Sequence, residues 1–482
     1  MHRPGRAAPA RATLVLTSNR GPVSFQDGPG GALQLRRGGG GLVSALGADA
    51  GEGSAWVCAA LSGADRRAAE QGLLPPGVRM LPLSPALFTR AYDGVANSLL
   101  WPLHHLLPTT AGIGDASASG GEDASGGEDW AAYERYAGAF AGAVDRAAGP
   151  GASVLVQDYH LSLVPALLRA RRPDLRTAHF SHTPWAPPDV LRRLPGARAL
   201  LAGMLGADAL GFLSPRWAGA FADCCEALLG VGVGPDGVDW QGRRVGLHVH
   251  PLGVDGPGLR ARAQEPDVQE RLARLRALVG GRQLLLRVDR SEPTKGIVPG
   301  LRAYAELLRR HPEHRGRVVH LVLAYPSRAA LPEYRALTAE VEQVAAEVNA
   351  AFGTAGWTPV HLEVRDDHAR SLAAFLLADV LLVNPVRDGM NLVAKEGPSL
   401  SRAGLALVLS REAGAADELG DDALLIDPHD LGQTADALHA ALVMPRHERA
   451  ARTTRLAAAA QALPPTAWLR AQQASLARLV SP

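Results

Sequence analysis

Four basic side chains follow apolar runs of this 482-residue chain, and their types suit the binding of phosphate groups. Arg290 and Lys295 come directly after the run "LLLRVD", and such an Arg/Lys pair suits a diphosphate. Arg20 follows "TLVLTS" and Arg328 follows "VVHLVLAYPS", so these two can hold a second phosphate. Because a single Arg or Lys is more often a solvated surface charge, the four carry weight only as a set.

An acidic residue, Asp388, lies beside Gly389 in the stretch "RDGMNLVAKEG", which follows the apolar run "ADVLLVNP". The pattern predicts a strand that ends here and a helix that starts at Asn391. A helix N-terminus offers free N–H groups and a positive dipole end, so it can bind an anion. A glycine before it lets a ligand approach the backbone. An ordinary strand-to-helix turn with Asn391 as N-cap is the other interpretation, and both stay open.

Asp158 and His182 occupy the same kind of position, after the runs "SVLVQ" and "TAHFS". Asp158, like Asp388, can accept hydrogen bonds from sugar hydroxyls, although an aspartate after a strand is often a helix N-cap. His182 is alternatively a packed or capping histidine. The glycine run at 38–41 is either a loop that admits a phosphate or only a turn.

The composition excludes several classes of protein. With 47% hydrophobic and 20% charged residues the chain is globular, and a net charge of +2 gives no reason to expect nucleic acid or an anionic membrane as partner. No run of 18 apolar residues exists, so no membrane span is expected. Cys58, Cys224 and Cys225 make no disulfide framework, which favours a reducing, cytoplasmic compartment.

Short apolar runs alternate with helical stretches along both halves of the chain. This alternation predicts the α/β class, with one doubly wound parallel sheet in each half. Ligands of such sheets bind beyond the carboxyl ends of the strands, which is where the residues above lie. The expected strands are 13–18, 55–59, 78–83, 153–158, 177–182 and 209–214, then 284–289, 318–325, 360–365, 380–385, 405–410 and 423–428.

The domain organisation follows from the Pro/Gly cluster "HPLGVDGPG" between the two halves. We expect a tail at 1–12, a first domain at 13–255, a second at 256–455, and a C-terminal helix within 456–482 whose docking place periodicity does not give. The tandem repeat "ASGGED" predicts a mobile acidic loop at 115–129.

Together these stretches resemble the trehalose-phosphate synthase family. The resemblance covers about 13–475 and rests on "SNRGPV", "GGGGLVSAL", "QDYHLSLVPALLR", "FSHTPW", "DRSEPTKGI", "AYPSR" and "NPVRDGMNLVAKE". It implies two facing Rossmann-like domains of the GT-B type with the active site in the cleft between them. It also implies a retaining glucosyltransferase that makes α,α-trehalose 6-phosphate from a nucleoside diphosphate glucose and glucose 6-phosphate.

The resemblance assigns residues to two ligands. The glucose 6-phosphate site would use Arg20, Tyr92, Trp101, Asp158 and Arg328. The nucleotide-sugar site would use Gly41, His182, Arg290, Lys295, Asp388, Gly389, Met390, Asn391, Leu392, Val393 and Glu396, with Glu396 on the ribose. Catalysis would fall to Asp158, His182, Arg290, Lys295 and Asp388. Since Arg and Lys supply the positive charge, neither a metal nor a cofactor is expected, and the oligomeric state stays open.

Two departures from the family pattern bear on the donor. "EPTK" keeps Lys295 but replaces the flanking residues Asp-Tyr-Ser that the family often shows. His368 stands where an aromatic residue is expected near the nucleobase, so the choice between GDP- and UDP-glucose stays open. Two other functions remain, a pseudo-glycosyltransferase that joins cyclitols and a non-catalytic sugar-phosphate sensor. The complete acceptor set argues against the first, and Arg290, Lys295 and Glu396 argue against the second.

Overall fold

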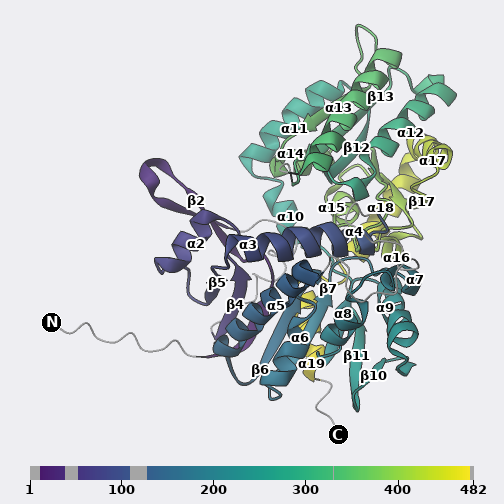
Figure 1. Ribbon diagram of the computed structural model, residues 1–482. Helices are drawn as coiled ribbons and strands as arrows, with labels where there is room; N and C mark the ends of the chain where they lie inside the picture. Colours follow the sequence, from purple (N-terminus) through teal and green to yellow (C-terminus); the bar gives the residue numbers. More distant parts are fainter. Residues whose placement is uncertain (1–10, 38–52, 109–126, 329–330, 478–482) are drawn as a thin grey trace. The chain divides into compact units, whose positions relative to one another are not determined.

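The computed structural model describes residues 11–37, 53–108, 127–328 and 331–477. The chain divides into two compact units (Figure 1). Unit 1 comprises Met1–His250 and Pro465–Pro482, and unit 2 comprises Pro251–Pro464. Each unit has its own sheet.

The sheet of unit 1 has nine strands in the order β5-β4-β1-β6-β7-β8-β11-β10-β9. The first seven run parallel, and β10 and β9 extend the edge in antiparallel pairing. The order reverses between β1 and β6, where the chain crosses from one half of the sheet to the other. The strands are β1 (Ala12–Thr17), β4 (Ser54–Ala59), β5 (Val78–Leu81), β6 (Ala148–Gln157), β7 (Arg176–Ser181), β8 (Ala209–Phe212), β9 (Val233–Gly234), β10 (Gly237–Trp240) and β11 (Arg243–Val249).

The helices of unit 1 bury apolar stripes against this sheet. Tyr133, Phe140 and Val144 of α5 are fully buried in one core with Val154 of β6. In Figure 1 the yellow α19 lies behind the strands of this sheet, and α5 and α6 lie in front of them. The helices are α2 (Gly63–Glu70), α3 (Pro85–Phe88), the π-helix η2 (Thr89–Leu100), α4 (Trp101–His104), α5 (Gly127–Ala147), η3 (Tyr159–Leu161), α6 (Val164–Arg171), α7 (Pro188–Leu191), α8 (Ala197–Met204), α9 (Pro215–Leu229) and α19 (Pro465–Ala477).

The sheet of unit 2 has six parallel strands in the order β14-β13-β12-β15-β16-β17, which reverses between β12 and β15. Its strands are nearly continuous Leu/Val runs because helices cover both faces. The packing of α12 with α13 and α17 makes one layer, and that of α11, α14, α15 and α18 makes the other. The strands are β12 (Gln283–Arg290), β13 (Val318–Tyr325), β14 (Val360–Val364), β15 (Val380–Val383), β16 (Ala406–Ser410) and β17 (Leu424–Ile426).

The helices of unit 2 begin and end at clear sequence signals. Pro266 opens α11, and Gly280 in left-handed conformation ends it. The helices are α10 (Gly256–Arg262), α11 (Pro266–Val279), η4 (Pro293–Lys295), α12 (Ile297–Arg310), η5 (Pro312–His314), α13 (Pro332–Phe352), α14 (His368–Phe375), α15 (Val393–Leu400), α16 (Ala416–Leu419), α17 (Leu431–Val443) and α18 (Arg446–Ala460).

The α/β class with two doubly wound sheets is confirmed, and each expected strand has a counterpart. The hairpin β2 (Val23–Asp27) and β3 (Leu33–Arg37) and the edge strands β9 to β11 were not predicted. The segment 456–482 holds the end of α18 and then α19, which belongs to unit 1. Of the expected acidic loop, 115–126 lies outside the described residues and Gly127 begins α5. Among the helices of the described segments, none is long and apolar enough to cross a membrane.

Candidate active-site elements of the two units

The switch point of unit 2 brings two predicted residues into direct contact. Lys295 ends η4 after β12, and Asp388 follows β15, the neighbouring strand. Their side chains form an ion pair, with Lys295 Nζ at 2.6 Å from Asp388 Oδ2, and both are largely buried. Burial alone would lower the pKa of Lys295, but Asp388 and Asp289 together raise it, so the ammonium stays charged.

The buried carboxylate of Glu292 interacts with the three predicted cations of unit 2, which are Arg290, Lys295 and Arg328. Arg290 Nη1 lies 2.7 Å from Glu292 Oε1, and Ser327 Oγ donates to the same oxygen at 2.9 Å. Burial alone would raise the pKa of Glu292, but the charges of Arg290, Lys295 and Arg328 together lower it. The Arg290 side chain is 58% exposed, so the glutamate anchors a guanidinium that still faces solvent. Glu292 was not predicted, although it stands in the "EPTK" segment.

A buried ion pair supports the loop that carries Lys295. Arg287 Nε lies 3.0 Å from Asp289 Oδ2, and neither side chain is more than 5% exposed. The same guanidinium donates to the backbone carbonyls of Lys295 and Gly296 and to Asn384 Oδ1. Burial favours the uncharged forms of both partners, lowering the pKa of Arg287 and raising that of Asp289. This costly arrangement fixes the position of the Lys295 backbone.

The helix after Asp388 starts later than predicted. Its first residue is Val393, and Leu392 is its N-cap without a side-chain bond. Asn391 lies two residues before the helix with a φ of 83°. Its Oδ1 accepts from Ala394 N at 3.2 Å, and its Nδ2 donates to Asp388 Oδ2 at 3.2 Å. The helix start at Asn391 was therefore wrong, because the chain first makes a left-handed turn that ties the amide to Asp388.

Gly389 and Met390 lie against a second loop, to which the sequence analysis assigned no ligand. A Cβ atom on Gly414 would lie 2.0 Å from Gly389 O, so only glycine fits at this crossing. Ala415 N donates to Met390 O at 2.8 Å. Gly414 and Ala415, in the segment "REAGAADEL", thus fix the position of the loop before α15.

Two residues of α15 carry buried charge. Burial raises the pKa of Glu396, the predicted ribose ligand, to about 7. Lys395 has no exposed side-chain surface; its Nζ pairs with Glu418 and donates to Leu252 O at 2.8 Å. The contacts of Lys395 anchor the helix.

In unit 1 the switch point joins two other predicted residues. Asp158, directly after β6, has a φ of 72°, and its Oδ1 accepts from His182 N at 3.3 Å. It precedes η3, yet its side chain makes no cap bond there, so the N-cap interpretation is wrong. Burial raises the pKa of Asp158 to about 6, and hydrogen bonds from the amides of Tyr159 and His182 act against the shift.

His182 is held by a chain of amide side chains. Gln157 Oε1 lies 2.9 Å from His182 Nε2, and Gln157 Nε2 donates to Gln472 Oε1 of α19 at 3.1 Å. The imidazole packs on Trp468 with ring centroids 5.6 Å apart. Burial, with a contribution from His179, lowers the pKa of His182 to about 3. The ring is therefore neutral at pH 7 and carries its proton on Nε2.

The predicted aromatic residues lie on and beside the π-helix η2. Tyr92 stacks on His160 with centroids 5.3 Å apart, and Tyr159 OH donates to Asn97 Oδ1 at 3.0 Å. His160 in turn approaches Asp158, with 3.8 Å between Nδ1 and Oδ2. Trp101 begins α4 and is nearly buried. A π-helix is rare and often marks a functional segment.

Arg20 follows β1 and is exposed, while the residues before it are buried and bonded. Asn19 Oδ1 accepts from Tyr136 OH, and Ser18 Oγ accepts from Trp56 Nε1 at 2.8 Å. Since β1 pairs with β6, Arg20 and Asp158 follow neighbouring strands. The hydrogen bonds of Ser18 and Asn19 fix the loop, and the Arg20 guanidinium faces solvent. Gly41 lies outside the described residues.

Backbone strain coincides with the predicted residues. Five described residues other than glycine have a positive φ, and three of them are Asp158, Arg328 and Asn391. Such conformations cost on the order of 1–3 kcal/mol and concentrate at functional sites. Arg328 has a φ of 42° and stacks over Tyr334 at 5.4 Å.

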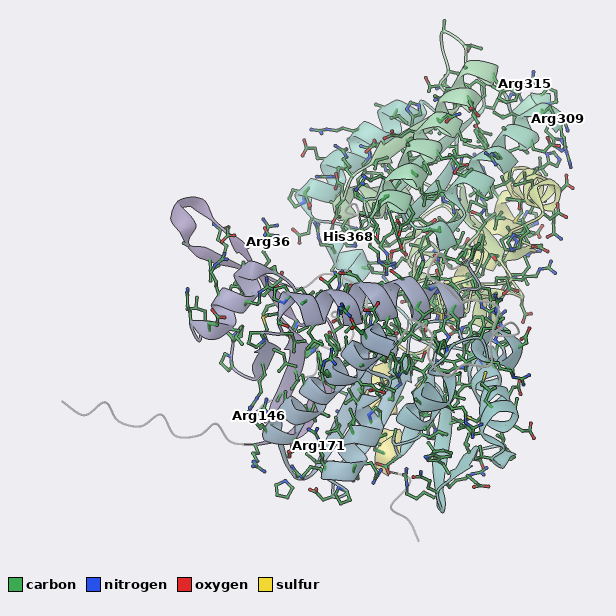
Figure 2. The ribbon with its side chains drawn as sticks, in the orientation of Figure 1. Arg36, Arg146, Arg171, Arg309, Arg315 and His368 are labelled. Carbon is green, nitrogen blue, oxygen red and sulfur yellow. The ribbon has the colours of Figure 1, made fainter. Side chains whose placement is uncertain are left out.

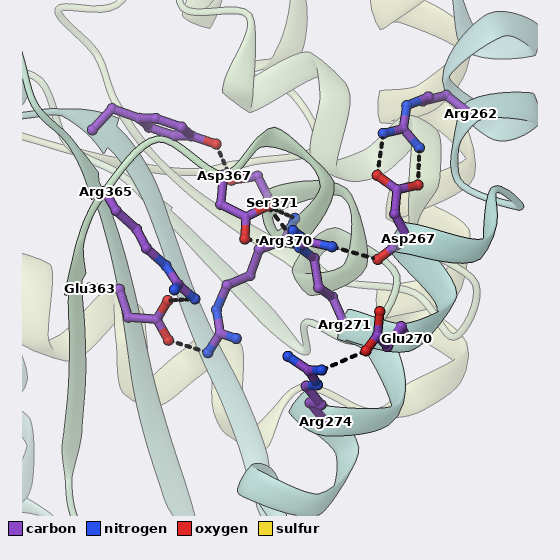
Figure 3. Close-up of polar contacts among 11 residues, drawn as sticks. Arg262, Asp267, Glu270, Arg271, Arg274, Glu363, Arg365, Asp367, Arg370 and Ser371 are labelled. Carbon is purple, nitrogen blue, oxygen red and sulfur yellow. Dashed lines mark hydrogen bonds and ion pairs between the residues drawn. The ribbon is translucent and has the colours of Figure 1, made fainter.

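An ion-pair network surrounds the N-terminus of α14, where His368 is the first residue (Figure 3). Asp367 caps the helix by accepting from Arg370 N at 3.1 Å and pairs with Arg271 of α11 at 2.8 Å. Arg370 pairs with Glu363 of β14. Burial lowers the pKa of His368, so its ring is neutral at pH 7. The network therefore holds the first turn of α14, which His368 begins.

Comparison with known proteins decides the family. The model of glycosyltransferase family 20 matches residues 50–478. This chain belongs to that family. A trehalose-6-phosphate synthase of Mycobacterium avium is 35% identical over 454 residues, which cover 90% of this chain and 89% of that protein.

Two further family relatives give the extent of the likeness. An α,α-trehalose-phosphate synthase [UDP-forming] of Dictyostelium discoideum is 32% identical over 445 residues, 90% of this chain but 58% of that protein. A UDP-forming α,α-trehalose-phosphate synthase from Burkholderia xenovorans, solved in complex with glucose-6-phosphate, matches with a TM-score of 0.81 at 27% identity. That match covers 97% of this chain and 100% of the other. This family 20 chain thus spans less than two thirds of the Dictyostelium protein but nearly all of the Burkholderia one.

Proposed function

We propose that this family 20 protein transfers glucose from a nucleoside diphosphate glucose to glucose 6-phosphate, forming α,α-trehalose 6-phosphate with retention of configuration. The observation that carries the proposal is the Lys295–Asp388 ion pair at the switch point of unit 2, with Arg290 and Arg328 near Glu292. Open α/β sheets bind nucleotides at such a point. The printed names of the Mycobacterium, Dictyostelium and Burkholderia relatives support the same reaction.

The residues of unit 2 bind the donor. Lys295 and Arg290 meet the diphosphate, and the amides of residues 389–393 cradle it in front of α15. Negative charge grows on the leaving phosphate as the glycosidic bond breaks, and one preorganised donor at such a charge is typically worth about 3–4 kcal/mol. Asp388 orients the Lys295 ammonium and accepts from a glucose hydroxyl. Glu396 accepts from the ribose.

The acceptor is glucose 6-phosphate. Arg20 and Arg328 bind its phosphate, Tyr92 and Trp101 line the site, and Asp158 accepts from the sugar. The acceptor hydroxyl attacks on the face that the diphosphate leaves, and the leaving phosphate takes its proton, so no protein nucleophile is required. His182 is neutral, so it donates Nε2–H to Gln157 and keeps Nδ1 for a hydroxyl donor.

The nucleobase is proposed as guanine or uracil, bound beside His368. The backbone of His368 opens α14, whose first turn carries the ion pairs of Asp367 and Arg370. A neutral imidazole offers one hydrogen-bond donor and one acceptor, so it suits either base. We place the reaction in the cytoplasm, because the three cysteines are free and buried.

The test is product formation from glucose 6-phosphate with GDP-, UDP- and ADP-glucose in parallel, followed by mass detection. A phosphorylated disaccharide supports the synthase, and the ranking of donors identifies the base. Folded protein that binds a nucleoside diphosphate but makes no product contradicts the proposal and favours the cyclitol-joining reaction. Protein that binds no nucleotide favours a sensor instead.

A further inference from the structure

A cluster of imidazoles lies in unit 2 where α12 ends. Its members are His311, Glu313 and His439, whose candidate ligand atoms all lie within 4.8 Å of one another. The rings of His311 and His439 stack with centroids 3.7 Å apart, and His311 Nδ1 lies 3.0 Å from Glu313 Oε1. A fourth side chain, His314, has its Nε2 3.0 Å from His439 Nδ1. Figure 2 labels Arg309 and Arg315, which bracket the segment.

The sequence builds this cluster from one short motif and one helix. In "HPEH", Pro312 cannot continue α12 and keeps the residue before it out of the helical region. His311 accordingly has a φ of −123° and a ψ of 74°. His439 comes from α17, which packs on α12. The sequence analysis expected no metal because Arg and Lys supply the positive charge, and no metal-ligand spacing shows this cluster, since His311 and His439 are 128 positions apart (439 − 311).

We propose that His311, Glu313 and His439 form a binding site for a divalent transition metal of the zinc type. Imidazole nitrogen with one carboxylate oxygen is a ligand set of zinc, whereas magnesium and calcium prefer oxygen alone. Zinc bonds to these atoms are about 2.0–2.1 Å long, so tetrahedral ligands lie about 3.4 Å apart. The candidate ligand atoms lie within 4.8 Å of one another, so on binding metal they close toward this spacing and the stacked rings turn relative to each other. Water completes the coordination.

His314 orients the ring of His439 by a hydrogen bond but is not one of the proposed metal ligands. It is 5% exposed, and its Nε2 lies 3.0 Å from His439 Nδ1, where it can accept the Nδ1 proton of His439. His439 then presents Nε2 with its lone pair, and a hydrogen bond of this kind commonly fixes a metal-bound histidine.

The neighbouring charges permit a cation. Arg310 is the nearest basic residue in sequence, but its guanidinium pairs with Glu306 and with Asp436, one turn before His439 on α17. The cluster precedes β13 and therefore lies toward the amino ends of the strands of unit 2. The candidate donor-binding residues follow the carboxyl ends. A metal here would tie η5 to α17 and stabilise unit 2, and this inference does not depend on the proposed function.

The direct test is titration of tag-free, chelator-treated protein with zinc chloride, followed by calorimetry and thermal unfolding. We expect one zinc ion to bind with micromolar or tighter affinity. At a free concentration about a hundredfold above Kd, mass action should raise Tm by several degrees. Cobalt(II) should give the visible absorption of a low-symmetry N/O site.

Variants locate the site. His439→Gln and Glu313→Gln should each weaken zinc binding at least tenfold and abolish the rise in Tm. His447→Gln, an exposed histidine on α18, is the matched control and should bind zinc as the parent does. Glu313 is 53% exposed, so its variant should fold normally. Absence of zinc binding, or equal binding by all variants, would overturn the proposal.

Discussion

The two switch points share one topology but differ in how they hold charge. In unit 2 the strand ends carry ion pairs, namely Lys295 with Asp388 and Arg290 with Glu292. In unit 1 the corresponding groups tend to lose charge, since burial raises the pKa of Asp158 to about 6 and lowers that of His182 to about 3. The exposed Arg20 is the cation that follows β1.

This difference fits two kinds of ligand group. A diphosphate needs fixed positive charge, and a buried cation is tolerated only beside a counter-ion. Sugar hydroxyls are neutral and need acceptors and donors at set positions, which a weakly charged carboxyl and a neutral imidazole supply. Under the proposed function, the same fold would present an anion site at one switch point and a hydroxyl site at the other.

Removing the Lys295 ammonium should have the largest effect. Lys295→Ala should lower kcat by about 10²–10³, because a charge aimed at the leaving phosphate is lost. Steady-state kinetics with the best donor measures the change, and circular dichroism checks folding. Arg302→Ala removes a surface cation paired with Glu340 and should leave kcat unchanged. Near-parental turnover of the Lys295 variant would refute its role at the diphosphate.

A substitution at Gly296, the residue after Lys295, tests how tightly unit 2 holds the loop that carries Lys295. Gly296 has a φ of 66°, and a Cβ atom there would lie 2.3 Å from Asn384 O. Gly296→Ala should cost about 3 kcal/mol of unfolding free energy, part from the φ angle and part from the overlap. Gly316 has a φ of 75° but nothing within 4 Å, so Gly316→Ala should cost only about 1 kcal/mol. Urea unfolding of both variants measures the difference, and equal costs would show that the loop can move.

The sequence predicted the strand ends well because buried parallel strands are continuous apolar runs. Asp158 and His182 follow β6 and β7, which are consecutive in the chain and adjacent in the sheet. Lys295 and Asp388 follow β12 and β15, which are neighbours only because the strand order reverses between them, and the sequence analysis predicted no strand order.

The supporting residues could not be predicted in the same way. Arg287 lies inside the run "LLLRVD", where a charge looks like an interruption of the strand. Its partner Asn384 follows β15 and comes near only once β12 and β15 pair. Gln472 is separated from Gln157 by most of the chain, and periodicity did not give the docking place of α19. The predicted start of α15 was wrong because Asn391 looks like an N-cap in the sequence, and only the structure shows its left-handed φ.

The same substitution should act in opposite directions at the two switch points. Burial raises the pKa of Asp158 from its ordinary value of 3.8 to about 6, so the folded state binds more protons between these values. Unfolding free energy then falls as pH rises from about 4 to 6, and the ionised carboxyl costs about 3 kcal/mol at pH 7. Asp158→Asn should raise Tm by a few degrees at pH 7 and by almost nothing at pH 4.

Asp388→Asn should instead lower Tm at pH 7, because it leaves Lys295 without its counter-ion. Calorimetric scans of both variants and the parent from pH 4 to 7.5 measure the contrast. Stabilisation by both variants, or by neither, would remove the distinction between the two switch points.

The smallest effect should come from Gln472, which ends the series of hydrogen bonds that runs from His182 through Gln157. Gln472→Ala breaks the contact with Gln157, which then loses one of the two bonds that orient it. One such bond is worth about 1 kcal/mol, so kcat should fall by less than about tenfold with KM nearly constant. Ser475→Ala removes a bond to His250 from the same helix and should leave kcat unchanged. Nitrogen-15 spectra of His182 should show more proton on Nδ1 in the Gln472 variant alone. An unchanged tautomer together with unchanged kcat would mean that unit 1 orients its imidazole without α19.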